Sequence, residues 1–514
     1  MNYRGWLLIF FMFVILYSAA LHTTATFNDP DSFYHARITE LMIERGGIIT
    51  KFPWLPFTAF SQSFIDHHLL YHAFLVPFIA LWGPLWGMKA AAACAFVAVI
   101  AAFILLLSRI VDARRDIRRR FLVLIFTASL FLNGVFTTRM NLEKIPALSL
   151  LWLLGGTYAL VSGKRVLTFF FSFFFVWLHG AWPLMPMLSI LYLIADQCSR
   201  KALGLCAWSV AGACAGLIIN PYFPDNIFFY LVQIFHVAIV TYGDLYEIGA
   251  EWYPANAQII SWGTGAVITA ASATAVFMFK AAFTSGTALS AKRTTIERFF
   301  FAATLVFFFL ALKSSRHGEY FVPFATLFGG IMATPFLESL SLKHAKELWK
   351  TCFLKRRSTA ILVSGIALLY GIFAPILIAS NLMAFREDGI PVEKHRYISA
   401  WMRQNIPRGS MVFNDQWGYF PSVWFWGGDN RFIAGLDPTF FYSLDPNLFW
   451  NYEALRKGTV QSGAARAIQR LFGAEAIIVS KENSALRAVL DRDSDATLVY
   501  EDGSGSIFTV SILR

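Results

Sequence analysis

The sequence predicts a polytopic α-helical membrane protein with a small α/β domain after the last membrane span. The first observation is composition: the 514 residues are 57% hydrophobic and only 15% charged, with a mean hydropathy of +0.55. A soluble protein of this size needs more charge to cover its surface. The second is the recurrence of apolar segments of about 20 residues, the length that spans a bilayer as a helix. The third is the segment 383–514, where Gly, Asp and Arg return to the frequencies of a soluble domain.

Most apolar segments are separated by short polar loops, so each is expected to form one span. They are residues 5–22, 88–108, 121–137, 145–162, 203–220, 257–280, 299–313, 318–336 and 359–382. The stretch 167–195 is too long for one span, and the sequence His179-Gly180-Ala181-Trp182-Pro183 at its centre predicts a break into two. The total is about eleven spans. The N-terminus resembles a signal peptide without a convincing cleavage site, so we interpret it as an uncleaved first helix.

The net charge of +11 is explained by topology rather than by binding to nucleic acid. Basic residues cluster in short loops between apolar segments, where they orient the helices and meet lipid headgroups. The arginine-rich loop 109–120 is the strongest signal for the inner side of the membrane. Counting residues 69–87 as a span would place this loop outside. Because Pro77 and Pro84 also interrupt that stretch, we interpret 69–87 as an interfacial helix that does not span.

With this choice the N-terminus lies inside and the unusual polar segments face outward. The outer segments are residues 23–87, 138–144, 221–256, 314–317 and the tail from 383 onward. The predicted domains are a transmembrane domain at 1–382, with its first outer loop at 23–87, and an extracytoplasmic α/β domain at 383–514. The five cysteines lie in or beside apolar segments without metal-ligand spacing, so they are expected to be small core residues.

Within the tail, the residue pattern predicts a mixture of strands and helices. Strand-like runs occur at 410–413, 476–480, 498–501 and 506–512. Helix-like runs occur at 393–404, 464–471 and 484–491. The sequence Asp502-Gly503-Ser504-Gly505 is typical of a hairpin turn between the last two strands.

The most informative polar segment follows the first predicted span and contains Asp29, Asp31, His35 and Arg37. If a helix resumes after Pro30, Asp31 and His35 are four residues apart and share one face. A carboxylate at the membrane surface can act as a general base or help hold a divalent metal. A helix cap is the alternative, because Asp before Pro is a good helix start. Both can hold, with Asp29 capping and Asp31 reacting.

Three further outer segments carry polar residues. The first is Asp66-His67-His68, which lacks the partners of a structural zinc site and fits an interfacial polar cluster or a contact to a phosphate or metal. The second holds Asn141 and Glu143, two oxygen donors that can approach one hard cation from an extended loop, although charged residues at a helix start are the alternative. The third holds Glu247 and Glu251, for which a solvated loop is the more frequent explanation.

A fourth outer segment carries Arg316 and His317 at the end of a predicted span. The planar guanidinium of Arg316 suits a lipid-linked phosphate, and snorkelling to headgroups is the alternative. Neither a nucleotide-binding loop nor a hydrolase elbow is present in the sequence. A cytosolic nucleotide is therefore not expected as the donor of a transfer reaction.

The segment from Asp31 through Thr39-Glu40-Leu41 to Gly46 resembles the start of the first outer loop in the catalytic subunit of oligosaccharyltransferases. Those enzymes belong to the GT-C class of polyprenyl-linked glycosyltransferases. The resemblance implies a GT-C-like catalytic domain at 1–382, with the interfacial helix at 69–87. It departs from the family at Asn141, where an aspartate is usual, and in the tail. There Asn414-Asp415-Gln416-Trp417-Gly418-Tyr419 matches the acceptor-recognition motif only at its Gly-Tyr end.

The resemblance also implies roles for the outer residues. Asp31 would be catalytic, and Arg316 with His317 would bind the donor phosphate. A divalent cation, Mg or Mn, would be held by residues from several loops: Asp31, Asn141, Glu143, and Glu247 or Glu251. Asp29, Arg37, Asp66, His67 and His68 would support the site.

The predicted function is transfer of a sugar or oligosaccharide from a polyprenyl phosphate or pyrophosphate to a protein or glycan acceptor outside the cytoplasm. The expected location is a bacterial or archaeal plasma membrane, with membrane lipids and no nucleic acid as partners. A transporter or flippase of lipid-linked glycans is the alternative, but it should place charges at mid-membrane depth and show repeat symmetry. A non-catalytic assembly subunit is a further alternative.

Overall fold

The computed structural model describes residues 3–240, 242–254, 291–339, 372 and 374–511. The predicted span 257–280 lies outside these residues, as does most of 359–382. The chain forms two compact units. We call Met1–Thr23, Ala92–Gly216 and Tyr253–Asp388 the helical unit, and Thr24–Ala91, Leu217–Trp252 and Gly389–Arg514 the mixed unit. The first outer loop thus groups with the tail rather than with the helices that follow it.

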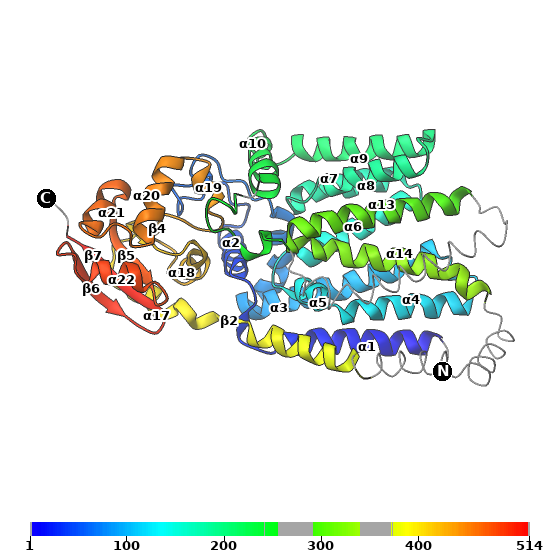
Figure 1. The fold of residues 1–514 in the computed structure, drawn as a ribbon, viewed down its shortest axis with the longest axis horizontal. Helices are drawn as coiled ribbons and strands as arrows, with labels where there is room; N and C mark the ends of the chain where they lie inside the picture. The colour runs from blue at the N-terminus through cyan, green and yellow to red at the C-terminus, as the bar shows by residue number, and fades with distance from the viewer. Residues whose placement is uncertain (1–2, 241, 255–290, 340–371, 373, 512–514) are drawn as a thin grey trace. The chain divides into compact units, whose positions relative to one another are not determined.

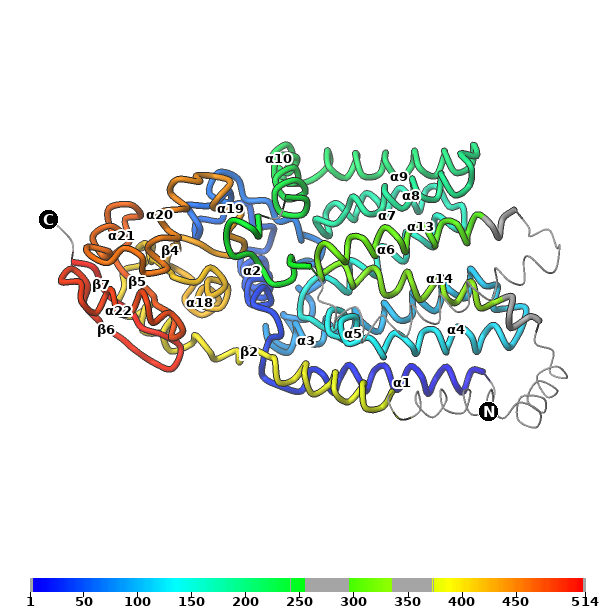
Figure 2. Tube along the Cα trace, in the orientation of Figure 1, coloured from blue at the N-terminus to red at the C-terminus, as the bar shows by residue number. Residues whose placement is uncertain are grey.

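The helical unit is a bundle of apolar helices (Figures 1 and 2). Its elements are α1 (Tyr3–Leu21), the second part of α3 (Leu69–Ile110), α4 (Ile117–Ser129), η2 (Leu130–Leu132), α5 (Gly134–Asn141), α6 (Pro146–Val161), α7 (Arg165–Leu178), α8 (Leu184–Ala195), α9 (Arg200–Ile218), α13 (Ala291–Lys313), η6 (Ser315–His317) and α14 (Gly318–Ser339). Glycines allow close packing: Gly212 and Gly216 of α9 lie against the backbone carbonyls of Phe169 and Phe173 on α7.

Among the described residues, α1, α3, α9 and Thr295–Lys313 of α13 are long and apolar enough to cross a membrane. The pair Ile117–Leu132 and Gly134–Asn141 passes the same test as one broken span, bent by 84°. The predicted break near His179 is confirmed, because α7 ends at Leu178 and α8 begins at Leu184.

Two boundaries differ from the prediction. The expected span 121–137 ends early, because Asn133 accepts a hydrogen bond from the backbone N–H of Phe136 and starts a new helix. The predicted interfacial helix and the helix that follows it together form α3. Gly83, with φ 72°, interrupts α3 between them. A Cβ on Gly87 would lie 2.6 Å from the carbonyl oxygen of Phe78. In a straight helix these residues would be about 13 Å apart along the axis, so α3 turns back sharply at Gly83.

The mixed unit contains the predicted α/β fold of the tail. A five-stranded sheet has the order β4-β3-β5-β7-β6. The strands are β3 (Met411–Asn414), β4 (Arg431–Phe432), β5 (Ala474–Ser480), β6 (Ala496–Glu501) and β7 (Gly505–Val510). β3 pairs in parallel with β4 and β5, and β7 pairs antiparallel with β5 and β6. The predicted hairpin is confirmed, because the N–H of Asp502 donates to the carbonyl of Gly505 over 2.9 Å.

Helices surround this sheet and extend the mixed unit. They are α2 (Asp31–Arg45), η1 (Ala59–Ser61), α10 (Asp225–Val232), η3 (Gln233–Val240), η4 (Ala250–Trp252), η7 (Val392–His395), α17 (Arg396–Asn405), η8 (Trp417–Tyr419), α18 (Phe420–Gly427), α19 (Thr439–Tyr442), α20 (Pro446–Arg456), α21 (Ala464–Phe472) and α22 (Ser484–Leu490). A short pair, β1 (Thr26–Phe27) with β2 (Ile390–Pro391), ties the start of the first outer loop to the start of the tail.

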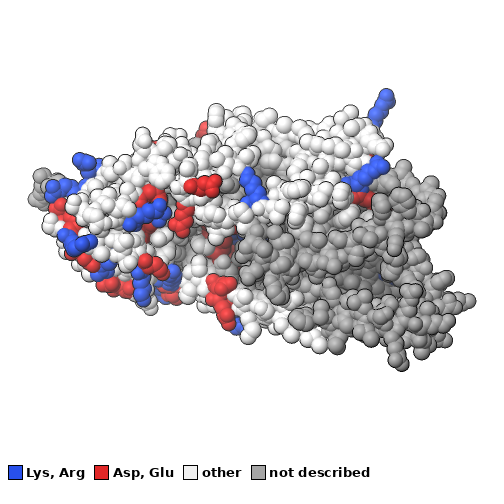
Figure 3. All heavy atoms as spheres, viewed as in Figure 1, with Lys and Arg blue, Asp and Glu red and all other residues white. Residues whose placement is uncertain are grey.

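The two units differ in surface charge. On the face shown in Figure 3, Lys and Arg alternate with Asp and Glu over the tail elements of the mixed unit. The described surface of the helical unit in that view is nearly free of charge except at helix ends. This contrast is typical of an integral membrane protein with a water-exposed domain.

Candidate active site

The site is built first on α2, whose N-terminus carries Asp31. The side chain of Asp29 accepts a hydrogen bond from the backbone N–H of Asp31 over 2.9 Å, which fixes the turn before the helix. Pro30 precedes the first helical residue, and Gly46 ends the helix with φ 64°. The predicted helix restart is confirmed. Asp31 therefore lies in the first turn, where the helix dipole favours a negative charge.

A row of buried, hydrogen-bonded side chains anchors α2 at His35, one turn after Asp31. His35 Nδ1 lies 2.8 Å from His72 Nε2, and His72 Nδ1 lies 2.7 Å from Asp66 Oδ2. Asp66 also accepts a bond from the N–H of His68. All three side chains of this row are buried. Sequence reasoning singled out Asp66 but did not assign His72 to the site, although its spacing from His68 was visible.

His67 lies beside this row with its ring against Phe229, at a centroid separation of 5.0 Å. Burial lowers the pKa of His67 to about 4, and the charge of Asp66 offsets part of that effect. His67 is therefore neutral at physiological pH. It can exchange a single hydrogen bond with a ligand but supplies no positive charge.

Asp437 is an acidic residue that sequence reasoning missed. Burial raises the pKa of its carboxyl group, and the charges of Asp31 and Glu251 raise it further. Three segments of the mixed unit thus bring carboxylates into electrostatic contact. Asp437 accepts the N–H of Thr439 at the start of α19, and the preceding Leu436 has a strained φ of 67°. The signal in the sequence was the repeated Asp-Pro pair before a helix, as at Asp29-Pro30.

Two of the predicted residues are held by partners within the mixed unit. Arg37 contacts Glu40 and Glu44 on its own helix, at 3.4 and 2.8 Å. Glu247 contacts Arg456 at 3.5 Å and is largely exposed. Both arrangements stabilise their own segments. Glu251 is the better candidate of the two outer-loop acids, because its charge reaches Asp437.

In the helical unit, Asn141 and Glu143 are fully buried. Asn141 Oδ1 accepts from Ser18 Oγ over 2.9 Å, and its amide donates to the carbonyl of Thr137. Glu143 lies 3.3 Å from His22 Nδ1. The expectation of an extended loop was wrong here: Asn141 is the last residue of α5, because the helix begins again at Gly134.

The segment with Arg316 and His317 forms the short helix η6 before α14. Next to it, Arg139 donates from Nε and Nη2 to the buried Glu319 Oε2 over 3.0 and 2.8 Å. Burial lowers the pKa of His317 to about 4, and the neighbouring charge of Arg316 lowers it too. His317 is therefore neutral, so any cationic contribution to phosphate binding comes from Arg316.

The predicted metal ligands do not form a ready-made site. In the parts of the chain that the structure describes, no three His, Cys, Asp or Glu side chains converge to hold a metal ion. The acceptor oxygen of Asn141 is already bonded to Ser18, and Glu247 is paired with Arg456. Of the remaining ligands, Asp31 and Glu251 belong to the mixed unit and Glu143 to the helical unit. The metal set therefore stays a prediction, and no chemical step below depends on it.

The tail segment 414–419, whose sequence is most similar to the acceptor-recognition motif, has a structural role. Asp415 is buried and accepts hydrogen bonds from the N–H and hydroxyl of Ser480 and from Asn483. The amide of Asn414 donates to the carbonyls of Gln416 and Ala434. These bonds join the end of β3 to the end of β5 and to neighbouring loops.

No family model and no curated protein matches the sequence. Solved structures do match. The chain is similar to the archaeal oligosaccharyltransferase AglB from Archaeoglobus fulgidus, solved with an inhibitory peptide and a dolichol-phosphate (TM-score 0.62, 13% identity, 99% of this chain and 74% of that chain). It is also similar to ArnT from Cupriavidus metallidurans bound to undecaprenyl phosphate (TM-score 0.55, 13% identity, 98% of each chain). A third match is the mycobacterial arabinofuranosyltransferase AftD (TM-score 0.53, 12% identity), of which the chain spans only 40%.

These matches confirm the coarse prediction, a mainly helical chain with the fold of GT-C glycosyltransferases. The number of spans and their orientation stay predictions. Two of the matched structures were solved with a polyprenyl-type phosphate lipid.

Proposed function

We propose that this protein is a membrane glycosyltransferase that moves a sugar or oligosaccharide from a polyprenyl phosphate or pyrophosphate to an acceptor outside the cytoplasm. The observation that carries the proposal is Asp31, which begins α2 on a GT-C fold and whose charge acts on the buried carboxyl group of Asp437. A reactive acid placed at the start of a rigid, anchored helix fits a catalytic role better than a structural one.

In this proposal Asp31 activates the acceptor. Its carboxylate takes a proton from an acceptor O–H or N–H while the acceptor atom bonds to the anomeric carbon of the sugar. The bond from that carbon to the phosphate oxygen breaks, and its electron pair stays on the lipid phosphate. The hydrogen-bonded chain of Asp66, His72 and His35 keeps α2 in one orientation during the reaction. General-base catalysis of this kind contributes about 10²–10⁴-fold to rate.

Arg316 would stabilise the phosphate that leaves. A guanidinium presents a planar fork that matches two phosphate oxygens, and it carries its charge at every accessible pH. The buried pair of Arg139 and Glu319 stabilises the segment that carries Arg316, because it links α5 to the start of α14. The neutral ring of His317 would add one hydrogen bond.

The test compares cells that express the wild-type protein, the Asp31→Asn variant or no protein. Mass spectrometry of lipid-linked sugars and of surface glycoconjugates is the measurement. We expect Asp31→Asn to match the cells without the protein: the lipid-linked sugar accumulates and its product is missing. Asp491→Asn is the matched control, because it makes the same change at an exposed carboxylate directly after α22. Normal product in Asp31→Asn cells, with equal protein levels, would disprove the assignment.

A further inference from the structure

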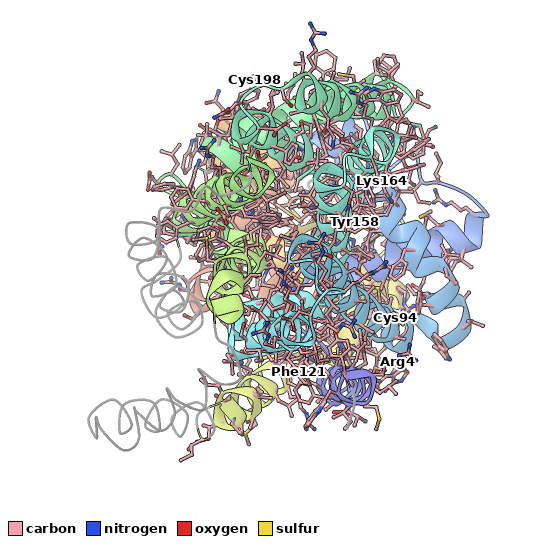
Figure 4. The ribbon with its side chains drawn as sticks, turned by 90° about the vertical axis from the view of Figure 1, so that its right-hand side faces the viewer. Arg4, Cys94, Phe121, Tyr158, Lys164 and Cys198 are labelled. Atoms are coloured by element: carbon pink, nitrogen blue, oxygen red, sulfur yellow. The ribbon has the colours of Figure 1, made fainter. Side chains whose placement is uncertain are left out.

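A second cluster of charged residues lies at the end of the helical unit that carries the N-terminus. A cavity of about 660 Å³ opens there, between the start of α1, the end of α3 and the loop before α7. Figure 4 looks onto this end and labels Arg4, Tyr158 and Lys164. The cavity is lined by Tyr3, Leu105, Ser108, Arg109, Asp112, Ala113, Arg114, Arg120, Tyr158, Ser162 and Lys164.

The lining is strongly cationic. Four basic side chains face one carboxylate, and that carboxylate, Asp112, is already paired with Arg115 at 2.6 Å. In the described part of the chain, no Asp or Glu forms an ion pair with Arg109, Arg114, Arg120 or Lys164. A cavity with this balance of charge favours an anion.

The cations are held in place by neutral partners. Arg120 donates to the backbone carbonyls of Ala113 and Arg114, and its guanidinium lies over the ring of Tyr3 at 5.9 Å. Lys164 lies over the ring of Tyr158 at 5.4 Å. Cation–π contacts and carbonyl bonds fix a charge without neutralising it. Arg120 and Lys164 are therefore positioned at the cavity before any ligand arrives.

Orientation of the helices does not require this arrangement. The rule that basic loops stay inside depends on the number of Lys and Arg residues in a loop, not on where their side chains point. Here two separate segments, the 109–120 loop and the loop before α7, contribute basic side chains to one cavity that two tyrosines also line. Basic pockets between helices at the inner side of a membrane are suited to anionic headgroups.

One wall of the cavity is apolar and faces outward. Leu105 of α3 lines it and is 65% exposed on a helix that is apolar enough to span a membrane. An occupant that meets this wall and the basic groups together has a charged head and a hydrocarbon tail. We propose that this cavity binds the phosphate headgroup of an anionic membrane lipid, from the leaflet next to the protein's N-terminus. The proposal does not depend on the glycosyltransferase reaction.

The test is native mass spectrometry of the purified full-length protein in detergent, with phosphatidylglycerol as the probe. We expect one retained lipid in the wild-type protein and at least tenfold weaker retention after Arg109→Gln, Arg120→Gln and Lys164→Gln are combined. The control combines Arg165→Gln, Arg200→Gln and Lys201→Gln, which remove three exposed charges that do not line the cavity. The single change Lys164→Gln, at an exposed side chain, tests the site without risk to folding and should weaken retention about threefold.

Equal loss in both triple variants would show that surface charge alone attracts the lipid, and full retention in the cavity variants would also overturn the proposal. A second arm adds inorganic phosphate at millimolar concentration. Displacement of the lipid by phosphate, with equal affinity for both, would assign the cavity to a soluble phosphate and reject the lipid.

Discussion

At the residue scale, the site could be predicted where chemistry and position coincide within one short segment. Asp31 was singled out because an acid follows a span and precedes a helix, and its catalytic role stays a prediction. Asp437 was missed and the hydrogen bond of His72 to His35 was not expected, because both depend on contacts with residues far away in the sequence. Asp437 interacts with Asp31 from the opposite end of the chain, and single-sequence patterns carry no record of such pairs.

Arg316 should act mainly on binding of the lipid donor. Replacing it with Gln removes a charge-assisted interaction worth about 1.5–3 kcal/mol, so KM for the lipid-linked donor should rise by about 10–100-fold. Arg316→Lys should recover only part of the loss, because Lys lacks the planar fork. Steady-state kinetics with donor extracted from the same cells measures this effect. Arg403→Gln, at an exposed position on α17, should leave KM unchanged; an unaltered KM in Arg316→Gln would contradict the role.

His395 should make the folded mixed unit sensitive to acid. Burial lowers the pKa of His395 to about 4, and Lys394 lowers it further. Its unfolded pKa is about 6.5, so the unfolded state binds more protons between these values and stability falls as pH drops through that window. The loss between pH 7 and pH 5 is about 1–2 kcal/mol.

Thermal unfolding of the full-length protein in detergent, at pH 7 and pH 5, tests this expectation. The decrease in Tm on acidification should be smaller in His395→Asn than in the wild-type protein. Asparagine is the appropriate replacement, because its amide can still bond to Ser422, which His395 Nδ1 contacts at 2.6 Å. An equal decrease in both proteins would show that His395 does not titrate in this range.

At the scale of elements, local patterns predicted the tail well and the broken helices poorly. Strands β3, β5, β6 and β7 fall within a few residues of the predicted runs. Apolar composition alone, however, did not reveal that Asn133 and Gly83 interrupt helices. A hydropathy average does not detect one residue whose side-chain hydrogen bond or positive φ turns the backbone.

Helix α2 is held in the mixed unit by an aromatic cluster. Trp424 of α18 is fully buried and contacts Tyr34 of α2, Phe52, Trp54 and Phe420, with ring centroids 5.0–6.0 Å apart. Trp54 also donates to the carbonyl of Gly428 over 2.6 Å. Figure 2 shows α2 and α18 side by side, although almost the whole chain separates them in sequence.

Trp424→Ala should therefore destabilise the protein by about 3–5 kcal/mol, the usual cost of an emptied aromatic site. Activity should fall at the same time, because α2 carries Asp31. Unfolding in detergent and glycan transfer are the two measurements. Trp450→Ala is the control, since Trp450 on α20 is 41% exposed. Equal destabilisation by both changes would contradict the anchoring role of Trp424.

At the scale of the whole molecule, the charge pattern predicted which loops share an end of the helical unit. Tyr3, three arginines of the 109–120 loop (Arg109, Arg114 and Arg120) and Lys164 line one cavity, and Lys201 lies next to Gly163. All of these segments were predicted to be inside. The predicted outer segment 138–144 likewise meets residues at the ends of predicted spans: Arg139 pairs with Glu319, and Glu143 with His22. The grouping follows from helix length, since each span carries the chain from one end to the other.

The excess of Lys and Arg predicts which end of the helical unit faces the inside of the membrane. An odd number of spans would then place the tail outside. In a background with the native cysteines replaced by alanine, Arg403→Cys in the tail should react with a membrane-impermeant maleimide in intact cells. Arg115→Cys, in the exposed basic loop, should react only after permeabilisation. The opposite pattern would show that the orientation is reversed. Reaction of both cysteines in intact cells would mean that an even number of spans separates positions 115 and 403. The basic cavity and the tail would then lie on the same side of the membrane, which contradicts the predicted topology.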